Sequence, residues 1–202
     1  MAYRIRMASP GDDAEGLLAV YAPYVLDTDV SFETAAPTVD EYRLRVASIA
    51  RSYPYLVVER TDADGARIAG FAYAHGLSDR AAYAWSVETS IYLAADAQGC
   101  GLGSVLLDTL EALLRRGGYT CAYACITADN AASVAFHEKH GYRPCGRFDN
   151  CAFKRGRWLS VVWMSKDLAE RGETPAAPRM PSNAEAAAVL ERANARLRAR
   201  TA

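Results

Sequence analysis

A short glycine-rich loop is the feature that most limits how this chain can fold. Residues 98–104 read Gln-Gly-Cys-Gly-Leu-Gly-Ser, after the apolar segment 90–93 and before a segment whose leucines recur with helical spacing. Glycines let a loop turn several backbone N–H groups toward one point, and the next helix adds unpaired first-turn N–H groups and the positive end of its dipole. This arrangement suits a phosphate or pyrophosphate. A tight strand-to-helix connection without a ligand would show the same glycines, so the loop alone leaves both possibilities open.

Hydrophobic periodicity along the rest of the chain predicts an α/β fold. Helices are expected at 11–26, from the capping box at Thr38 to about Arg51, at 101–116 and at 131–140. Strands are expected near residue 5 and at 55–59, 68–74, 83–93, 120–126, 142–149 and 158–166, with a hairpin turn at 62–65. The order of these elements predicts a mixed, mostly antiparallel central sheet flanked by helices on both faces.

The composition changes near residue 168, where a stretch rich in proline and alanine begins. We therefore expect one domain over residues 1–168, followed over residues 169–202 by a linker and a C-terminal amphipathic helix. A capping box at Ser182 starts this helix. Its apolar stripe is thin, so we expect the helix either to dock weakly or to stay free. The stripe consists of Ala186, Leu190, Ala193 and Leu197.

Bulk composition argues against several classes of function. The 202 residues carry a net charge of −1 and a sequence pI of about 6.3, so no general attraction to nucleic acid or to an anionic membrane is expected. The N-terminus lacks the apolar core of a signal peptide, and no apolar run approaches the roughly 18 residues of a membrane helix, so we expect a soluble cytoplasmic protein. The five cysteines fit reduced thiols, and the spacing of Cys121 and Cys125 does not fit a zinc site, so no metal is expected.

Two separated motifs resemble those of the GNAT acyltransferases. The stretch 98–103 has the spacing Gln-x-x-Gly-x-Gly and resembles the pyrophosphate-binding pattern of that family. Residues 130–142 resemble the family's Asn-x-x-Ala-x-x-x-Tyr-x-x-x-Gly-Phe segment, in register at Asn130 and Gly141. Further stretches resemble the phosphinothricin N-acetyltransferase group, which includes acetyltransferases of methionine sulfone and methionine sulfoximine. These stretches lie at 30–34, 53–57, 70–74, 80–88 and 153–158.

The resemblance implies acetyl-CoA as the cosubstrate. Backbone N–H groups of the glycine loop would bind its pyrophosphate, and the pantetheine arm would lie along the preceding strand, where Ile91 and Leu93 offer main-chain partners if the strand edge is splayed. Asn130 would bond the arm while also capping its own helix. The coenzyme contacts implied in this way are Ile91, Tyr92, Leu93, Gln98, Gly99, Cys100, Gly101, Leu102, Gly103, Ser104, Asn130 and Ser133.

Glu88 is the candidate general base. Strand alternation puts it on a polar face with Ser86 and Ser90, which indicates a cavity on that side, although a solvated or ion-paired glutamate gives the same pattern. The resemblance at this position favours a carboxylate that takes the proton of an amine in a partly dry cleft. His137 occupies the family's tyrosine position facing the coenzyme sulfur, where an imidazole could act as an acid or as a second base.

Three residues correspond to the acceptor side of the phosphinothricin group. Arg80 offers a bidentate partner for a carboxylate or phosphinate, Tyr83 a wall with a hydroxyl, and Phe32 an apolar contact for the acceptor side chain. Each of these residues also fits a plain surface or packing role. The same group is homodimeric, which implies a homodimer here with residues 153–158 at the interface.

The sequence and its resemblance together predict an acetyl-CoA-dependent N-acetyltransferase that acts on the α-amine of a small amino acid or analogue by direct transfer in a ternary complex. No serine or cysteine shows the context of a nucleophilic triad, so no acetyl-enzyme is expected. Two alternatives stay open. One is a GNAT enzyme for another amine, such as a peptide N-terminus or a polyamine. The other is an acyl-CoA-binding regulatory module without turnover.

Overall fold

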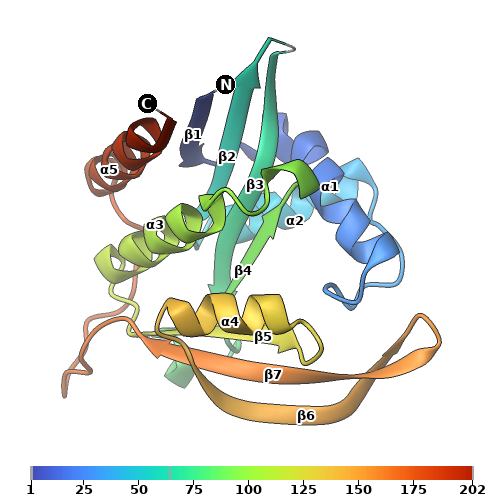
Figure 1. The fold of residues 1–202 in the computed structure, drawn as a ribbon. Helices are drawn as coiled ribbons and strands as arrows, with labels where there is room; N and C mark the ends of the chain where they lie inside the picture. The colour runs from blue at the N-terminus through green and yellow to red at the C-terminus, as the bar shows by residue number, and fades with distance from the viewer. Residues whose placement is uncertain (1, 64, 202) are drawn as a thin grey trace.

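The computed structural model describes residues 2–63 and 65–201 and contains a seven-stranded sheet with helices on both faces (Figure 1). The strand order is β1-β2-β3-β4-β5-β7-β6, with every neighbouring pair antiparallel except the parallel pair β4 and β5. The predicted fold class is confirmed. The strands are β1 (Ala2–Met7), β2 (Tyr55–Asp62), β3 (Gly65–Gly76), β4 (Ser86–Leu93), β5 (Cys121–Thr127), β6 (Arg143–Lys154) and β7 (Arg157–Asp167).

Within the described residues, five α-helices cover the sheet and two short 3₁₀ turns flank β4. Helices α1 and α2 lie on one side of strands β1–β4, and α3 and α5 lie on the other (Figure 1). The helices are α1 (Pro10–Asp27), α2 (Val39–Ala50), α3 (Leu102–Arg116), α4 (Ala131–Lys139) and α5 (Asn183–Thr201), and the 3₁₀ turns are η1 (Ala81–Tyr83) and η2 (Ala95–Ala97). Among the described helices, none is both long and apolar enough to cross a membrane.

Two hydrophobic cores stabilise this arrangement, one on each face of the sheet. Strand β2 serves both, because alternate residues point to opposite faces. Leu56 and Val58 are fully buried under α3, whereas Tyr55 and Val57 are buried under α1 and α2. The continuous apolar run of β2 therefore reflects a strand that is covered on both sides.

The local signals in the sequence place most helix ends correctly. Pro10 is the first residue of α1, and Thr38 forms the expected capping box with Glu41. Asn130 caps α4 through a hydrogen bond from the Ser133 N–H to its side chain (3.1 Å), and Gly141 has a φ of 85° just beyond that helix.

Several strand boundaries differ from the predictions. The strand expected from residue 83 begins at Ser86, because the preceding Ala81–Tyr83 form a 3₁₀ turn. The last two strands are longer than expected, since the chain reverses tightly at Arg155 and Gly156, which have φ values of 50° and 77°. In the predicted hairpin turn at 62–65, position 64 lies outside the described residues.

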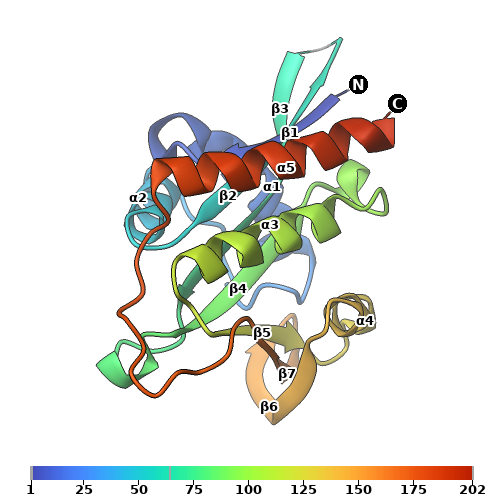
Figure 2. The same cartoon turned by 90° about the vertical axis from the view of Figure 1, so that its left-hand side faces the viewer.

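Helix α5 docks on the sheet. Of the two states expected for it, docked or free, the structure shows the docked one. Val189, Ala193 and Leu197 are buried among residues of α3 and β1, and Figure 2 shows α5 running beside α3. Asn194 also pairs with the outer edge of β1. It accepts a hydrogen bond from the N–H of Ile5 (2.7 Å) and donates one to its carbonyl (2.9 Å). The helix thereby covers an edge strand that would otherwise expose its pairing groups.

The docking of α5 predicts a loss of stability when Asn194 is replaced. Asn194→Ala should lower the free energy of unfolding by about 1–3 kcal/mol, because it leaves both main-chain groups of Ile5 without their partner. The matched control is Arg196→Ala, which removes only an exposed ion pair to Asp108 and should cost less than about 1 kcal/mol. Urea unfolding measures both changes, and equal losses would contradict the edge-pairing role of Asn194.

Candidate functional site

A cavity of about 550 Å³ opens where β4 and β5 part. Its walls come from the second half of β4, the glycine loop, the end of β5, the helix α4, and the end of α1 with the loop that follows it. The structure thus gathers segments separated by more than 100 residues around one space. The predicted site residues that line it are Ile91, Tyr92, Leu93, Gln98, Gly99, Gly103, Asn130, Ser133 and His137.

The opening exists because β4 and β5 pair for only three residues, from Ser86 to Glu88 on the β4 side. Beyond that point the hydroxyl of Thr89 donates to the carbonyl of Tyr123 on β5 (3.1 Å), so a side chain replaces the next main-chain bond. β3 continues to pair with β4 along its other edge as far as Leu93. One edge of β4 is therefore splayed, which is the condition set above for a pantetheine arm to lie along this strand.

Tyr24 occupies part of that free edge, and sequence analysis did not identify it. Its hydroxyl donates to the carbonyl of Leu93 (2.6 Å) and lies 3.4 Å from the Leu93 N–H. The Gln98 side chain donates to the same hydroxyl at 3.0 Å. Because main-chain groups alternate in direction along a strand, those of Ile91 face the same opening as those of Leu93. The helical pattern places Tyr24 on the apolar face of α1 but gives no signal for a partner 69 residues further on.

The glycine loop has the backbone conformation that its composition predicts. Gly99 and Gly101 have φ values of 74° and 79°, in the left-handed region that favours glycine. Gly101 immediately precedes α3, so the positive end of this 15-residue helix begins at the loop.

Four of the predicted loop contacts do not line the cavity. Leu102 is buried in the core, and the Ser104 hydroxyl lies 3.0 Å from His140 Nε2. The thiol of Cys100 donates to the Ala97 carbonyl at 3.0 Å. The side chains of Cys100, Leu102 and Ser104 therefore make contacts within the protein and do not face the cavity. Gly101 has no side chain and forms the N-cap of α3.

His137 is a buried histidine on the cavity wall, with 7% of its surface exposed. Its Nδ1 lies 2.8 Å from the carbonyl oxygen of Ser133, which can only accept, so Nδ1 carries the proton of the neutral ring. Burial lowers the pKa of His137 below its ordinary value. The ring is therefore neutral at pH 7 and holds its free electron pair on Nε2.

Glu88 is the last residue of β4 that pairs with β5. Its side chain is 22% exposed, and Oε2 lies 3.9 Å from Nε2 of His75 on the neighbouring strand. Burial raises the pKa of Glu88, and the electrostatic interaction with His75 opposes this effect. Glu88 does not itself line the cavity, but Thr89 and Ser90 do. Its charge also acts on Cys125 in the cavity wall, where desolvation and then Glu88 raise the pKa of the thiol to about 12.

The three predicted acceptor residues lie outside the cavity lining. Arg80 and Tyr83 belong to an exposed segment around η1, and 44% of Tyr83 is exposed. Phe32 is half-buried in the loop after α1, close in sequence to Thr28 and Val30, which do line the cavity. Among the described residues, no group of three or more His, Cys, Asp or Glu side chains is placed to hold a metal ion.

Comparison with known proteins matches this sequence to one family. A family model described as an acetyltransferase (GNAT) domain matches residues 5–163. A phosphinothricin N-acetyltransferase from Alcaligenes faecalis is 37% identical over 159 residues, which are 78% of this chain and 79% of that protein. An L-methionine sulfoximine/L-methionine sulfone acetyltransferase from Pseudomonas paraeruginosa is 30% identical over 164 residues, which are 81% of this chain and 94% of that protein.

A solved structure agrees with these sequence matches. The crystal structure of a GNAT superfamily phosphinothricin acetyltransferase from Sinorhizobium meliloti, in complex with acetyl-CoA, has a TM-score of 0.80 and 32% identity. The aligned region covers 91% of this chain and 98% of the Sinorhizobium meliloti chain. Since the family match spans most of the chain and includes both motifs around the splayed strands, the chain belongs to the GNAT family of acetyltransferases.

Proposed function

We propose that this protein transfers the acetyl group of acetyl-CoA to the α-amine of a small amino acid or analogue of the phosphinothricin, methionine sulfone or methionine sulfoximine type. The observation that carries the proposal is the cavity between β4 and β5, which runs from the glycine loop to His137 and lies beside Glu88. The names of the two relatives described above support this acceptor class.

The glycine loop would hold the pyrophosphate through backbone N–H groups between Gly99 and Ser104, where no side chain needs to carry the charge. The outward main-chain groups of Ile91 would bond the pantetheine arm, while the Tyr24 hydroxyl keeps those of Leu93 satisfied. Asn130 and Ser133 line the opposite side of the same cavity. These contacts fit a long, flexible thioester that has a charged end and an amide-rich arm.

Glu88 would take the proton from the acceptor amine, directly or through one water. An amine with a pKa of about 9–10 is mostly protonated at pH 7, so the attack requires a base. His137 supports proton removal rather than proton donation, because its Nδ1 proton is bonded to Ser133 and Nε2 holds a free electron pair. The raised pKa of Cys125 keeps this cavity thiol protonated, which favours direct transfer over an acetyl-enzyme.

The acceptor would be bound by Phe32, from the loop after α1, and by Arg80 and Tyr83, from the exposed segment around η1. Arg80 would pair with its carboxylate. A homodimer completes the proposal, in which the exposed rings of Phe153 and Trp158 pack against a second copy. These rings are 58% and 62% exposed and lie 5.4 Å apart between centroids. The expected compartment is the cytoplasm.

A thiol-release assay with acetyl-CoA tests the proposed reaction. The panel contains phosphinothricin, methionine sulfone, methionine sulfoximine, ordinary amino acids, spermidine and short peptides. We expect turnover with the first three and little with spermidine, because an acceptor site containing Arg80 repels a polycation. Turnover confined to peptides or spermidine would assign another amine. Tight acetyl-CoA binding without turnover of any amine would instead indicate a binding module.

Replacing Glu88 by glutamine tests the base. Glu88→Gln should lower kcat/KM by roughly 10²–10⁴ near neutral pH, because the isosteric amide cannot accept the proton. In the wild type, activity should fall as the pH drops through the raised pKa of Glu88, since the protonated carboxyl is inactive. The deficit of the variant should shrink at high pH, where the free amine is abundant.

The control for this substitution is Glu138→Gln, an isosteric change on the exposed face of α4 next to His137. It should leave the rate and the pH profile unchanged. An unchanged profile for Glu88→Gln as well would remove Glu88 from the mechanism.

A further inference from the structure

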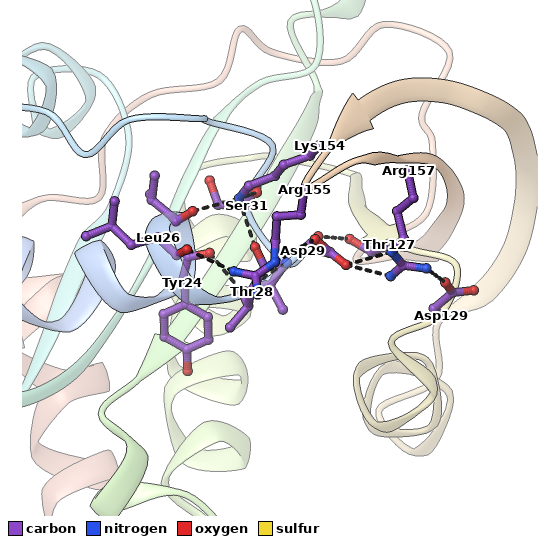
Figure 3. A network of polar contacts seen from close by, with 12 residues as sticks. Tyr24, Leu26, Thr28, Asp29, Ser31, Thr127, Asp129, Lys154, Arg155 and Arg157 are labelled. Carbon is purple, nitrogen blue, oxygen red and sulfur yellow. Dashed lines mark hydrogen bonds and ion pairs between the residues drawn. The ribbon is translucent and has the colours of Figure 1, made fainter.

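Lys154 is a buried cation that the proposed chemistry does not use. It lies at the end of β6, just before the tight turn into β7, and is only 5% exposed. Its ammonium donates to three main-chain carbonyls, those of Val25 (2.8 Å), Thr28 (2.8 Å) and Ser31 (2.5 Å). Figure 3 shows this side chain reaching from the hairpin into the loop after α1, more than 120 residues away in sequence. A buried ammonium ordinarily pairs with a carboxylate, so its placement among carbonyls requires an explanation.

The end of helix α1 explains the placement. The last carbonyls of a helix lack partners within the helix and carry the negative end of its dipole. The last turn of α1 contains no basic residue of its own. Lys154 and its neighbour Arg155, which donates to the carbonyl of Leu26 (3.0 Å), supply the missing donors from the hairpin. The cation therefore caps α1 and holds the loop that follows it.

Asp29 extends the contact from this loop to the opposite cavity wall. Arg157 donates to Asp29 Oδ2 (2.5 Å) and to Asp129 Oδ2 (2.8 Å), so one guanidinium joins the loop after α1 to the segment before α4 (Figure 3). The Thr127 hydroxyl donates to the main-chain carbonyl of Asp29 at 2.6 Å. Since Thr28 and Thr127 both line the cavity, these contacts connect two of its walls.

Two further contacts anchor the far end of the loop. The Ser31 hydroxyl lies 2.8 Å from the Tyr21 hydroxyl, and Glu33 forms a 2.6 Å ion pair with Arg45 of α2. Phe32 therefore lies between two fixed residues, and Lys154 holds the first of them through the Ser31 carbonyl.

We propose that Lys154 is a positioning residue for the acceptor: by bonding the carbonyls of Val25, Thr28 and Ser31, it fixes the loop that carries Phe32 and one wall of the cavity. Lys154 itself does not line the cavity. Arg157 assists by holding this wall to the β5–α4 connection through Asp29 and Asp129. The effect on the acceptor rests on the proposed function, whereas the effect on the loop does not.

Lys154→Met tests the proposal, because it keeps the apolar stem and removes every donor. Lys139→Met is the matched control, since Lys139 is an exposed lysine on α4. In the free protein, hydrogen exchange of residues 28–33 should become faster in Lys154→Met, while that of β2 and β3 stays as in the wild type. With substrates, the KM of the acceptor should rise about tenfold and that of acetyl-CoA by less than about threefold. Lys154→Arg should recover part of the acceptor affinity.

The possible outcomes distinguish a failure of this proposal from a failure of the proposed function. Unchanged exchange at residues 28–33 would overturn the anchoring of the loop by Lys154, whatever the enzyme acetylates. Faster exchange with equal changes in both KM values would overturn the acceptor role. If no amine is turned over, faster exchange would still support the anchoring, and only the proposed function would fail. If Lys154→Met does not fold, Arg157→Gln, at a half-exposed position, should give the same pattern with smaller changes.

Discussion

The interruption of pairing between β4 and β5 is the constraint on which the site depends. Two parallel neighbours that continued their hydrogen bonds past Glu88 would close the sheet and leave no room between the strands. The Thr89 hydroxyl takes over the contact to Tyr123 at the point where the main-chain bonds end. From there the strands diverge, and the free edge of β4 becomes the wall of a cavity. This free edge begins next to Glu88, and its other end leads into the glycine loop.

An open gap in a sheet leaves its surroundings without the support of strand pairing, and the rest of the fold supplies that support from both sides. Tyr24 of α1 satisfies the exposed main-chain groups of Leu93, where the strand leads into the loop. The β6–β7 hairpin reaches back with Lys154 and Arg157 to fix the wall formed by the loop after α1. On the far face, α5 covers the edge of β1 through Asn194. These contacts join segments distant in sequence, so the fold around the cavity depends on tertiary contacts.

The parts of this picture that follow local rules could be predicted from the sequence. The glycine spacing predicted the loop and the start of α3, Asn130 predicted the cap of α4, and alternation along β4 predicted which face carries Glu88. Each of these depends on neighbours within a few residues.

The start of β4 was placed too early because a short apolar stretch at 81–83 has no periodicity that distinguishes a strand from a 3₁₀ turn. The tertiary partners of Tyr24 and Lys154 left no local signal, since a tyrosine on an apolar helix face and a lysine near a turn are common. The docking of α5 was undecided for a related reason, because Asn194 contributes nothing to an apolar stripe and acts only when it meets β1.

The central claim is that coenzyme A lies between β4 and β5 with its pyrophosphate on the glycine loop. A crystal structure of the protein with coenzyme A tests this claim most directly. The account predicts electron density for the pyrophosphate against the backbone N–H groups of residues 99–104 and for the pantetheine arm along β4 at Ile91, with the thiol toward His137. Coenzyme bound on another face of the sheet, or an arm that makes no contact with β4, would contradict it.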